Sequence, residues 1–182
     1  MEAHGIVPDV VDSVPKEKIE VKFGDVEAAF GNVLTPTQVQ NPPTTLSWPI
    51  EDGAVYTLCK TAQVVFARAD PKFNVLKGFP HKLVLAIQEI ALQTSASLGY
   101  RYLLSLKQDG SSLHRYIYLA YKQPGKLTCD EPRLTNTNGD NRGCFSIRKF
   151  AEKYSLELVA GNLYQAEYDD YCEKLYQQLD GK

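Results

Sequence analysis

The residues best suited to chemistry lie in one short stretch, residues 111–125, which reads SSLHRYIYLAYKQPG. His114 and Tyr116 are two positions apart, so on an extended segment they share one face while Arg115 points to the other. An imidazole beside a phenol offers hydrogen-bond donors to a small anion. The competing interpretation is a partly buried histidine, satisfied by its neighbours, at the end of a strand.

Catalysis has little support in the same stretch. Asp109, Ser111, Ser112 and His114 are the residue types of a catalytic triad. Residues this close on one extended segment do not converge on one another, and no G-x-S-x-G turn frames either serine. No spacing in the chain brings a cysteine to a histidine or groups the ligands of a metal. We therefore expect a protein that is not an enzyme and needs no metal or cofactor.

Most of the elements that would position these residues are predicted strands. YIYLAYKQ and AVYTLCK are rich in β-forming residues, and KIEVKF alternates apolar and polar positions. Pro36, Pro42 and Pro43 exclude a helix between them and predict an edge strand or a loop. The residues before the histidine strand are ambiguous. Residues 82–98 favour a helix by propensity, with a buried strand over KLVLAI as the alternative.

Two further segments predict helices near the end of the chain. FSIRKFAEKY has Ser146 as its N-cap and an apolar face of Ile147, Phe150, Ala151 and Tyr154. In AEYDDYCEKLYQQLDGK the acidic residues of the first turns suit the helix dipole. Its apolar side is formed by Tyr168, Tyr171, Cys172, Leu175 and Leu179.

Composition and charge limit the classes of function. The 182 residues are 43% hydrophobic and 23% charged, which is typical of one soluble globular domain. A net charge of −2 gives no electrostatic footprint for nucleic acid. No apolar stretch approaches the roughly 18 residues of a membrane-spanning helix, and the N-terminus lacks a leader pattern. Four scattered cysteines favour reduced thiols, so we expect a cytoplasmic monomer with at most peripheral membrane contact.

Long motifs in both halves resemble a known family. They are LTPTQVQNPPTTLSW, GAVYTL, VAGNLYQAEYDDYCEKLYQQLDGK and the run LHRYIYLAYKQPGKLTCDEPRLTNTNGDNRGCFSIRKFAEKY. These segments closely resemble the phosphatidylethanolamine-binding protein family, above all its animal cytosolic members, the group that includes the Raf kinase inhibitor protein. The resemblance covers residues 5–61 and 110–182, so we treat residues 1–182 as one domain.

The resemblance implies a fold, a pocket and a role. The fold is mainly β, with a large antiparallel sheet packed on a smaller sheet and with C-terminal α-helices. The pocket is small, lies at a sheet edge and holds a phosphate-like anion or a phospholipid head group. Its histidine and tyrosine correspond to His114 and Tyr116, its second histidine to His81, and a tyrosine at its edge to Tyr176. Packing of the C-terminal helix is an equal alternative for Tyr176. The implied role is binding and regulation of kinases or serine proteases.

Residues 62–109 depart from the family pattern at this pocket. An Asp-Pro-Asp-Ala-Pro-Ser-Arg motif is replaced by AQVVFAR, with Ala62 and Val64 in place of the two aspartates. A Gly-Ser-Gly-Pro-Pro loop is replaced by LSLKQ at residues 104–108, which removes the close backbone approach that glycines allow. We therefore expect weak ligand binding, or a protein-interaction module that has lost its ligand. A rebuilt paralogue and a pair of compensating frameshifts or an alternative exon both explain such a block.

Overall fold

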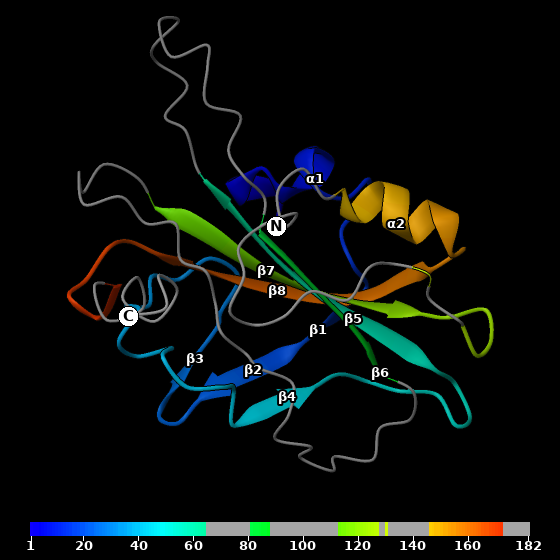
Figure 1. The fold of residues 1–182 in the computed structure, drawn as a ribbon, viewed down its shortest axis with the longest axis horizontal. Coiled ribbons are helices and arrows are strands. Elements are labelled where there is room, and N and C mark those ends of the chain that lie inside the picture. The colour runs from blue at the N-terminus through cyan, green and yellow to red at the C-terminus, as the bar shows by residue number, and fades with distance from the viewer. Residues whose placement is uncertain (65–80, 88–112, 128–129, 131–145, 173–182) are drawn as a thin grey trace, which may run out of the picture.

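The computed structural model describes residues 1–64, 81–87, 113–127, 130 and 146–172, which form two β-sheets and a few short helices (Figure 1). In the larger sheet, order β1-β8-β7-β5-β6, only the β1–β8 pair is parallel. Its strands are β1 (Glu17–Lys18), β8 (Glu157–Ala166), β7 (His114–Lys122), β5 (Tyr56–Val64) and β6 (His81–Ile87). The smaller antiparallel sheet consists of β3 (Val26–Glu27), β2 (Glu20–Phe23) and β4 (Thr45–Ser47).

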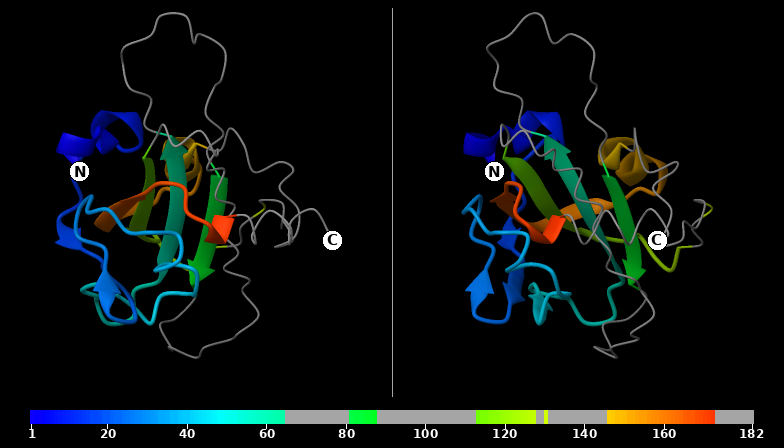
Figure 2. Two further views of the ribbon diagram at one scale, coloured as in Figure 1. Left: turned by 90° about the vertical axis from the view of Figure 1, so that its left-hand side faces the viewer. Right: turned by 60° about the vertical axis from the view of Figure 1, so that its left-hand side comes forward.

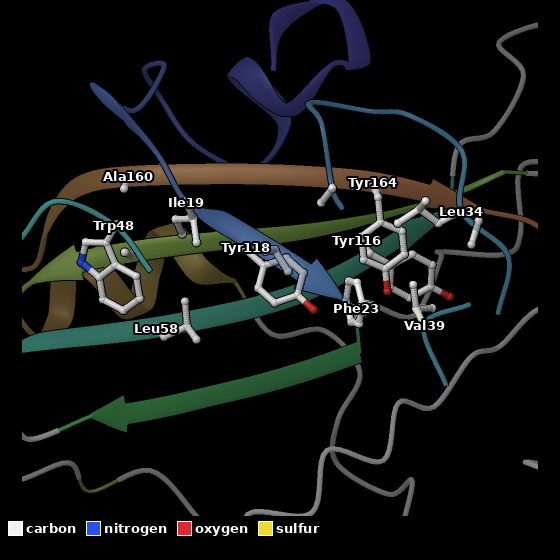
Figure 3. Close-up of a cluster of buried hydrophobic side chains, with 14 of the residues drawn as sticks. Ile19, Phe23, Leu34, Val39, Trp48, Leu58, Tyr116, Tyr118, Ala160 and Tyr164 are labelled. Atoms are coloured by element: carbon white, nitrogen blue, oxygen red, sulfur yellow. The ribbon is translucent and has the colours of Figure 1, made fainter. Parts of the chain in front are cut away.

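The large sheet is covered on both faces, which is why most of β7 is buried. Successive residues of a strand point to opposite faces. Tyr116 and Tyr118 accordingly join the core between the two sheets, together with Phe23 and Trp48 (Figure 3). Leu119 and the residues two positions before and after it, Ile117 and Tyr121, belong to a second core on the other face. We call these the tyrosine face and the aliphatic face.

Short helices lie over the aliphatic face (Figures 1 and 2). They are the 3-10 helix η1 (Glu2–His4), α1 (Ile6–Asp9) and α2 (Ile147–Lys153). The predicted N-cap of α2 is confirmed, because Lys149 N donates to Ser146 Oγ over 3.3 Å and Ile147 and Phe150 are buried. None of the helices in the described residues has the length and apolarity needed to cross a membrane.

Asn162 on β8 fixes the chain of the small sheet against the large one. Its side chain is fully buried, and its Nδ2 donates to the carbonyl oxygens of Ile19, at 2.7 Å, and Ala28, at 2.8 Å. Its Oδ1 accepts from Phe30 N at 3.0 Å, where the backbone has a positive φ of 49°. One amide thus satisfies three backbone groups that no strand ladder pairs, as buried polar groups require.

The predicted mainly β fold, with a large sheet on a smaller one, is confirmed. The helix predicted over residues 82–98 is wrong where the structure describes the chain, because residues 81–87 form β6 and pair antiparallel with β5. Sheet pairing overrides the weak helix propensity of a short apolar run. The C-terminal helix also begins later than predicted, since Ala166 ends β8. Residues 173–182 lie outside the described residues.

Candidate functional site

Strand register brings three of the four predicted site residues to one end of the large sheet. Ala62 on β5 pairs with His81 on β6 and, on its other side, with Tyr116 on β7. Tyr116 pairs in turn with Tyr164 on β8. One row therefore crosses four strands, and neighbouring strands are about 4.8 Å apart. His81 and Tyr116 flank the same residue of the central strand.

The adjacent row contains the second predicted histidine. His114 pairs with Val64 on β5 and with Ala166 on β8. Ala62 and Val64, which replace the family aspartates, are therefore the direct cross-strand neighbours of Tyr116 and His114. The loss of both carboxylates falls within this site, where it removes the groups that could hold a histidine or bind a ligand proton.

Tyr116 is packed into the core and does not line an open recess. It is 2% exposed, and its ring stacks on that of Tyr164 with centroids 5.0 Å apart and 12° between the planes (Figure 3). Phe23 of the small sheet meets the Tyr164 ring edge-on at 5.7 Å. His114 is also buried, at 4% exposure. An open anion pocket lined by this pair requires both side chains to reach solvent, and their burial contradicts that expectation. Tyr116 is buried in the core that it shares with Val21 and Phe23 of the small sheet.

Lys60 is the residue of this region that the sequence reasoning missed. It lies on β5 two positions before Ala62, is 6% exposed, and pairs with Tyr118 across the strands. Its Nζ is 4.9 Å from the ring centroid of Tyr118, 5.5 Å from that of Tyr116 and 5.6 Å from that of Tyr164. We call Lys60 and these three rings the tyrosine cluster. A lysine inside the apolar strand AVYTLCK was the available signal, because lysine is almost never fully buried.

Burial lowers the pKa of Lys60. Desolvation lowers the pKa of this amine well below its usual 10.5, since an ammonium ion is costly to remove from water. The tyrosine rings favour the charged form through their negative faces, and the Tyr164 hydroxyl lies 3.5 Å from Nζ. Desolvation acts against this attraction and lowers the pKa of Lys60. The tyrosine cluster therefore holds an amine that loses its proton more readily than a surface lysine does.

Arg115 points away from this site, as predicted, and ties the N-terminal segment to β7. Its Nη1 donates to the carbonyl oxygen of His4, and its Nη2 lies 3.9 Å from Oδ2 of Asp9. Arg148 on α2 holds the same segment, because its Nε lies 2.8 Å from Oδ1 of Asp12. These contacts anchor the start of the chain beside the aliphatic face.

The remaining predictions fall partly outside the described residues. Tyr176 and the replaced loop at residues 104–108 lie there, and His81 is described by its backbone alone. The binding roles of His81, His114, Tyr116 and Tyr176 thus stay predictions. Within the described ranges, no group of three or more His, Cys, Asp or Glu side chains is placed to hold a metal ion.

The chain is similar to proteins of known structure over nearly its whole length. A solved structure described as the CG7054 solution structure is 33% identical and covers 97% of this chain and 98% of its own, with a TM-score of 0.60. A curated Drosophila melanogaster protein named "Putative odorant-binding protein A5" is 27% identical over 178 residues, 97% of this chain and 82% of that protein. No family model matches the sequence.

More distant structures define the class of fold. The carboxypeptidase Y inhibitor, solved with its cognate proteinase, is 19% identical over 92% of this chain and 93% of its own, with a TM-score of 0.60. A phosphatidylethanolamine-binding protein of Plasmodium falciparum is 19% identical over 91% and 94%, with a TM-score of 0.58. The two packed sheets are thus those of a phosphatidylethanolamine-binding fold. With the 33% identical relative and the sequence motifs, the chain belongs to the phosphatidylethanolamine-binding protein family.

Proposed function

We propose that this protein is a binding module, not an enzyme, for a small phosphate-like anion such as a phospholipid head group. The observation that supports it is the register of the large sheet. Two adjacent rows bring the positions of His81, His114 and Tyr116 together at one end of β6, β5 and β7. Two imidazoles and a phenol can donate hydrogen bonds to phosphate oxygens.

We expect the affinity to be low for two physical reasons. Ala62 and Val64 supply no carboxylate, and each lost charge-assisted hydrogen bond costs roughly 1.5–3 kcal/mol, about tenfold or more in Kd. His114 and Tyr116 are also buried, so a ligand must displace packed side chains before it reaches them. Binding in the millimolar range fits both conditions.

Titration calorimetry with O-phosphorylethanolamine tests this proposal. We expect saturable heat for the unaltered protein and its loss in His114→Ala. The matched control is Tyr121→Phe, a change on the same strand but on the aliphatic face, which should leave binding unchanged. Absence of heat at millimolar ligand in a folded protein, or equal loss in the control, would contradict the proposal.

The second candidate function is a protein-interaction module that regulates a kinase or inhibits a protease. It is favoured by the likeness to the carboxypeptidase Y inhibitor, a protein solved in complex with a proteinase. Adding the protein to a serine-protease assay should then slow peptide hydrolysis. His114→Ala should inhibit as strongly as the unaltered chain, since this function does not need the site at the end of the sheet.

A further inference from the structure

We propose that Lys60 is a covalent capture site for short-chain aldehydes, which it holds as an imine within the tyrosine cluster. The proposal does not rest on phosphate binding, because the reacting residue is Lys60 and the ligand is neutral, although Tyr116 belongs to both sites. It rests on three observations: a buried primary amine, three aromatic rings around it, and a phenol hydroxyl at hydrogen-bonding distance from it.

The position of Lys60 favours nucleophilic attack. An amine attacks a carbonyl only in its neutral form, and lysines that form imines in proteins are typically those held in apolar surroundings. Nζ lies within 6 Å of three ring centroids in the core between the sheets. Two lysines nearer the surface serve for comparison: Lys122 contacts Glu51 and Lys22 contacts Glu20, and each carboxylate raises the pKa of the lysine it contacts.

The reaction needs no oxidant, reductant or cofactor. The Nζ lone pair forms a bond to the carbonyl carbon, the carbonyl π electrons move to oxygen, and a proton transferred from nitrogen gives a carbinolamine. Loss of the second nitrogen proton and of the hydroxyl group as water then forms the C=N bond. The Tyr164 hydroxyl, 3.5 Å from Nζ, is placed to relay these protons.

Packing sets the size of the ligand, and burial protects the product. Added carbon atoms in a well-packed core force side chains out of their preferred positions, so we expect an aldehyde of one or two carbons to be accepted more readily than a long chain. An aldehyde enters during the local openings that folded proteins undergo. Once the cluster closes, it excludes the water that would hydrolyse the imine.

Reductive trapping of the unaltered protein tests the proposal. The folded chain is incubated with acetaldehyde and cyanoborohydride at pH 7.5, and ethylated lysines are located by peptide mass spectrometry. We expect Lys60 to be ethylated at least ten times faster than Lys122 or Lys22. Hexanal in place of acetaldehyde should label Lys60 more slowly relative to the same two lysines.

Two comparisons separate a specific site from general reactivity. In urea-unfolded protein the advantage of Lys60 over Lys122 should vanish, because the tyrosine cluster no longer exists. Tyr164→Phe keeps the ring and removes the hydroxyl, so labelling of Lys60 should slow about tenfold without loss of the near-ultraviolet circular dichroism of the core. Labelling of Lys60 in the folded, unaltered protein at or below the rate of Lys122 would overturn the proposal.

Discussion

The two faces of the large sheet are built from the same strands but hold different chemistry. On β7, Ile117 and Leu119 point to the aliphatic face, where Cys59, Leu163 and the helices pack around them. Tyr116 and Tyr118 point to the tyrosine face, beside Lys60 and under the small sheet.

The two faces therefore differ in the polar groups that they bury. Apolar groups on the aliphatic face stabilise the fold at roughly 25 cal/mol for each Å² of apolar surface they bury. The tyrosine face buries an amine and an amide, Lys60 and Asn162, which cost free energy unless they are satisfied. Titratable groups with shifted pKa values, such as Lys60, tend to cluster at binding and catalytic sites. We expect both faces to contribute to stability, and binding and reactivity to belong to the tyrosine face alone.

The largest effect is expected for Asn162→Leu. The change removes the partners of the Ile19 and Ala28 carbonyls and of the Phe30 amide, at roughly 1–3 kcal/mol for each buried group left unsatisfied. We expect unfolding by urea to show a loss of about 4 kcal/mol. Asn41→Leu, at an exposed position, is the control and should change stability by less than about 0.5 kcal/mol. Equal effects of both changes would refute the role given to Asn162.

Leu119→Ala should cost about 3 kcal/mol, because it leaves a cavity in the fully buried aliphatic face. Thermal unfolding measures this loss. A change on the aliphatic face should not affect the tyrosine face. The folded fraction of Leu119→Ala should therefore still bind O-phosphorylethanolamine and still trap acetaldehyde at Lys60. Loss of either activity from the folded protein would show that the faces do not act separately.

Lys60→Met should stabilise the protein at neutral pH and flatten its pH dependence. The lowered pKa means that the folded state binds fewer protons than the unfolded state at pH values between the folded pKa and 10.5. Stability therefore falls as pH drops through this window, by up to about 1.4 kcal/mol per unit, and the loss is complete below the folded pKa.

Urea unfolding from pH 6 to pH 10 measures this slope. The titratable groups of the described elements that face Lys60 are the phenols of Tyr116 and Tyr118 on β7 and of Tyr164 on β8. Lys122→Met serves as the control: water screens its exposed pair with Glu51, so the slope should survive the change. An unchanged slope in Lys60→Met would show that Lys60 stays charged in the core.

Tyr116→Phe should have the smallest effect on stability, below about 1.5 kcal/mol, because the ring stacked on Tyr164 is kept. Binding of O-phosphorylethanolamine should weaken about tenfold through the loss of one donor. Scanning calorimetry measures the stability and titration calorimetry the affinity, each with Tyr121→Phe as the control. Unchanged affinity would remove Tyr116 from the site and leave it a core residue only.

Local patterns predicted much of this structure from the sequence. Strand geometry predicted that His114 and Tyr116 share a face opposite Arg115, and Ser146 predicted the start of α2, since both depend on neighbours within a few residues. The failures depend on distant contacts. β6 becomes a strand only through its pairing with β5, and Asn162 binds a carbonyl 143 positions away.

The site was predictable in part for the same reason. The shared side of His114 and Tyr116 follows from strand geometry, whereas the burial of Tyr116 depends on a core that it forms with small-sheet residues far away in the sequence, such as Phe23. Lys60 was overlooked because a single lysine within an apolar strand is normally placed at an edge. Only the register, which sets it opposite Tyr118, shows that it lies within the core.

The most direct test of the difference between the faces is the protonation of Lys60 itself. An NMR titration of the lysine side chains, with Lys60→Met to assign the signal, compares it with Lys122 in one experiment. We predict that Lys60 loses its proton well below pH 10.5 and that Lys122 does so above it. Titration of Lys60 at or above the pH of Lys122 would contradict a neutral amine in the tyrosine cluster.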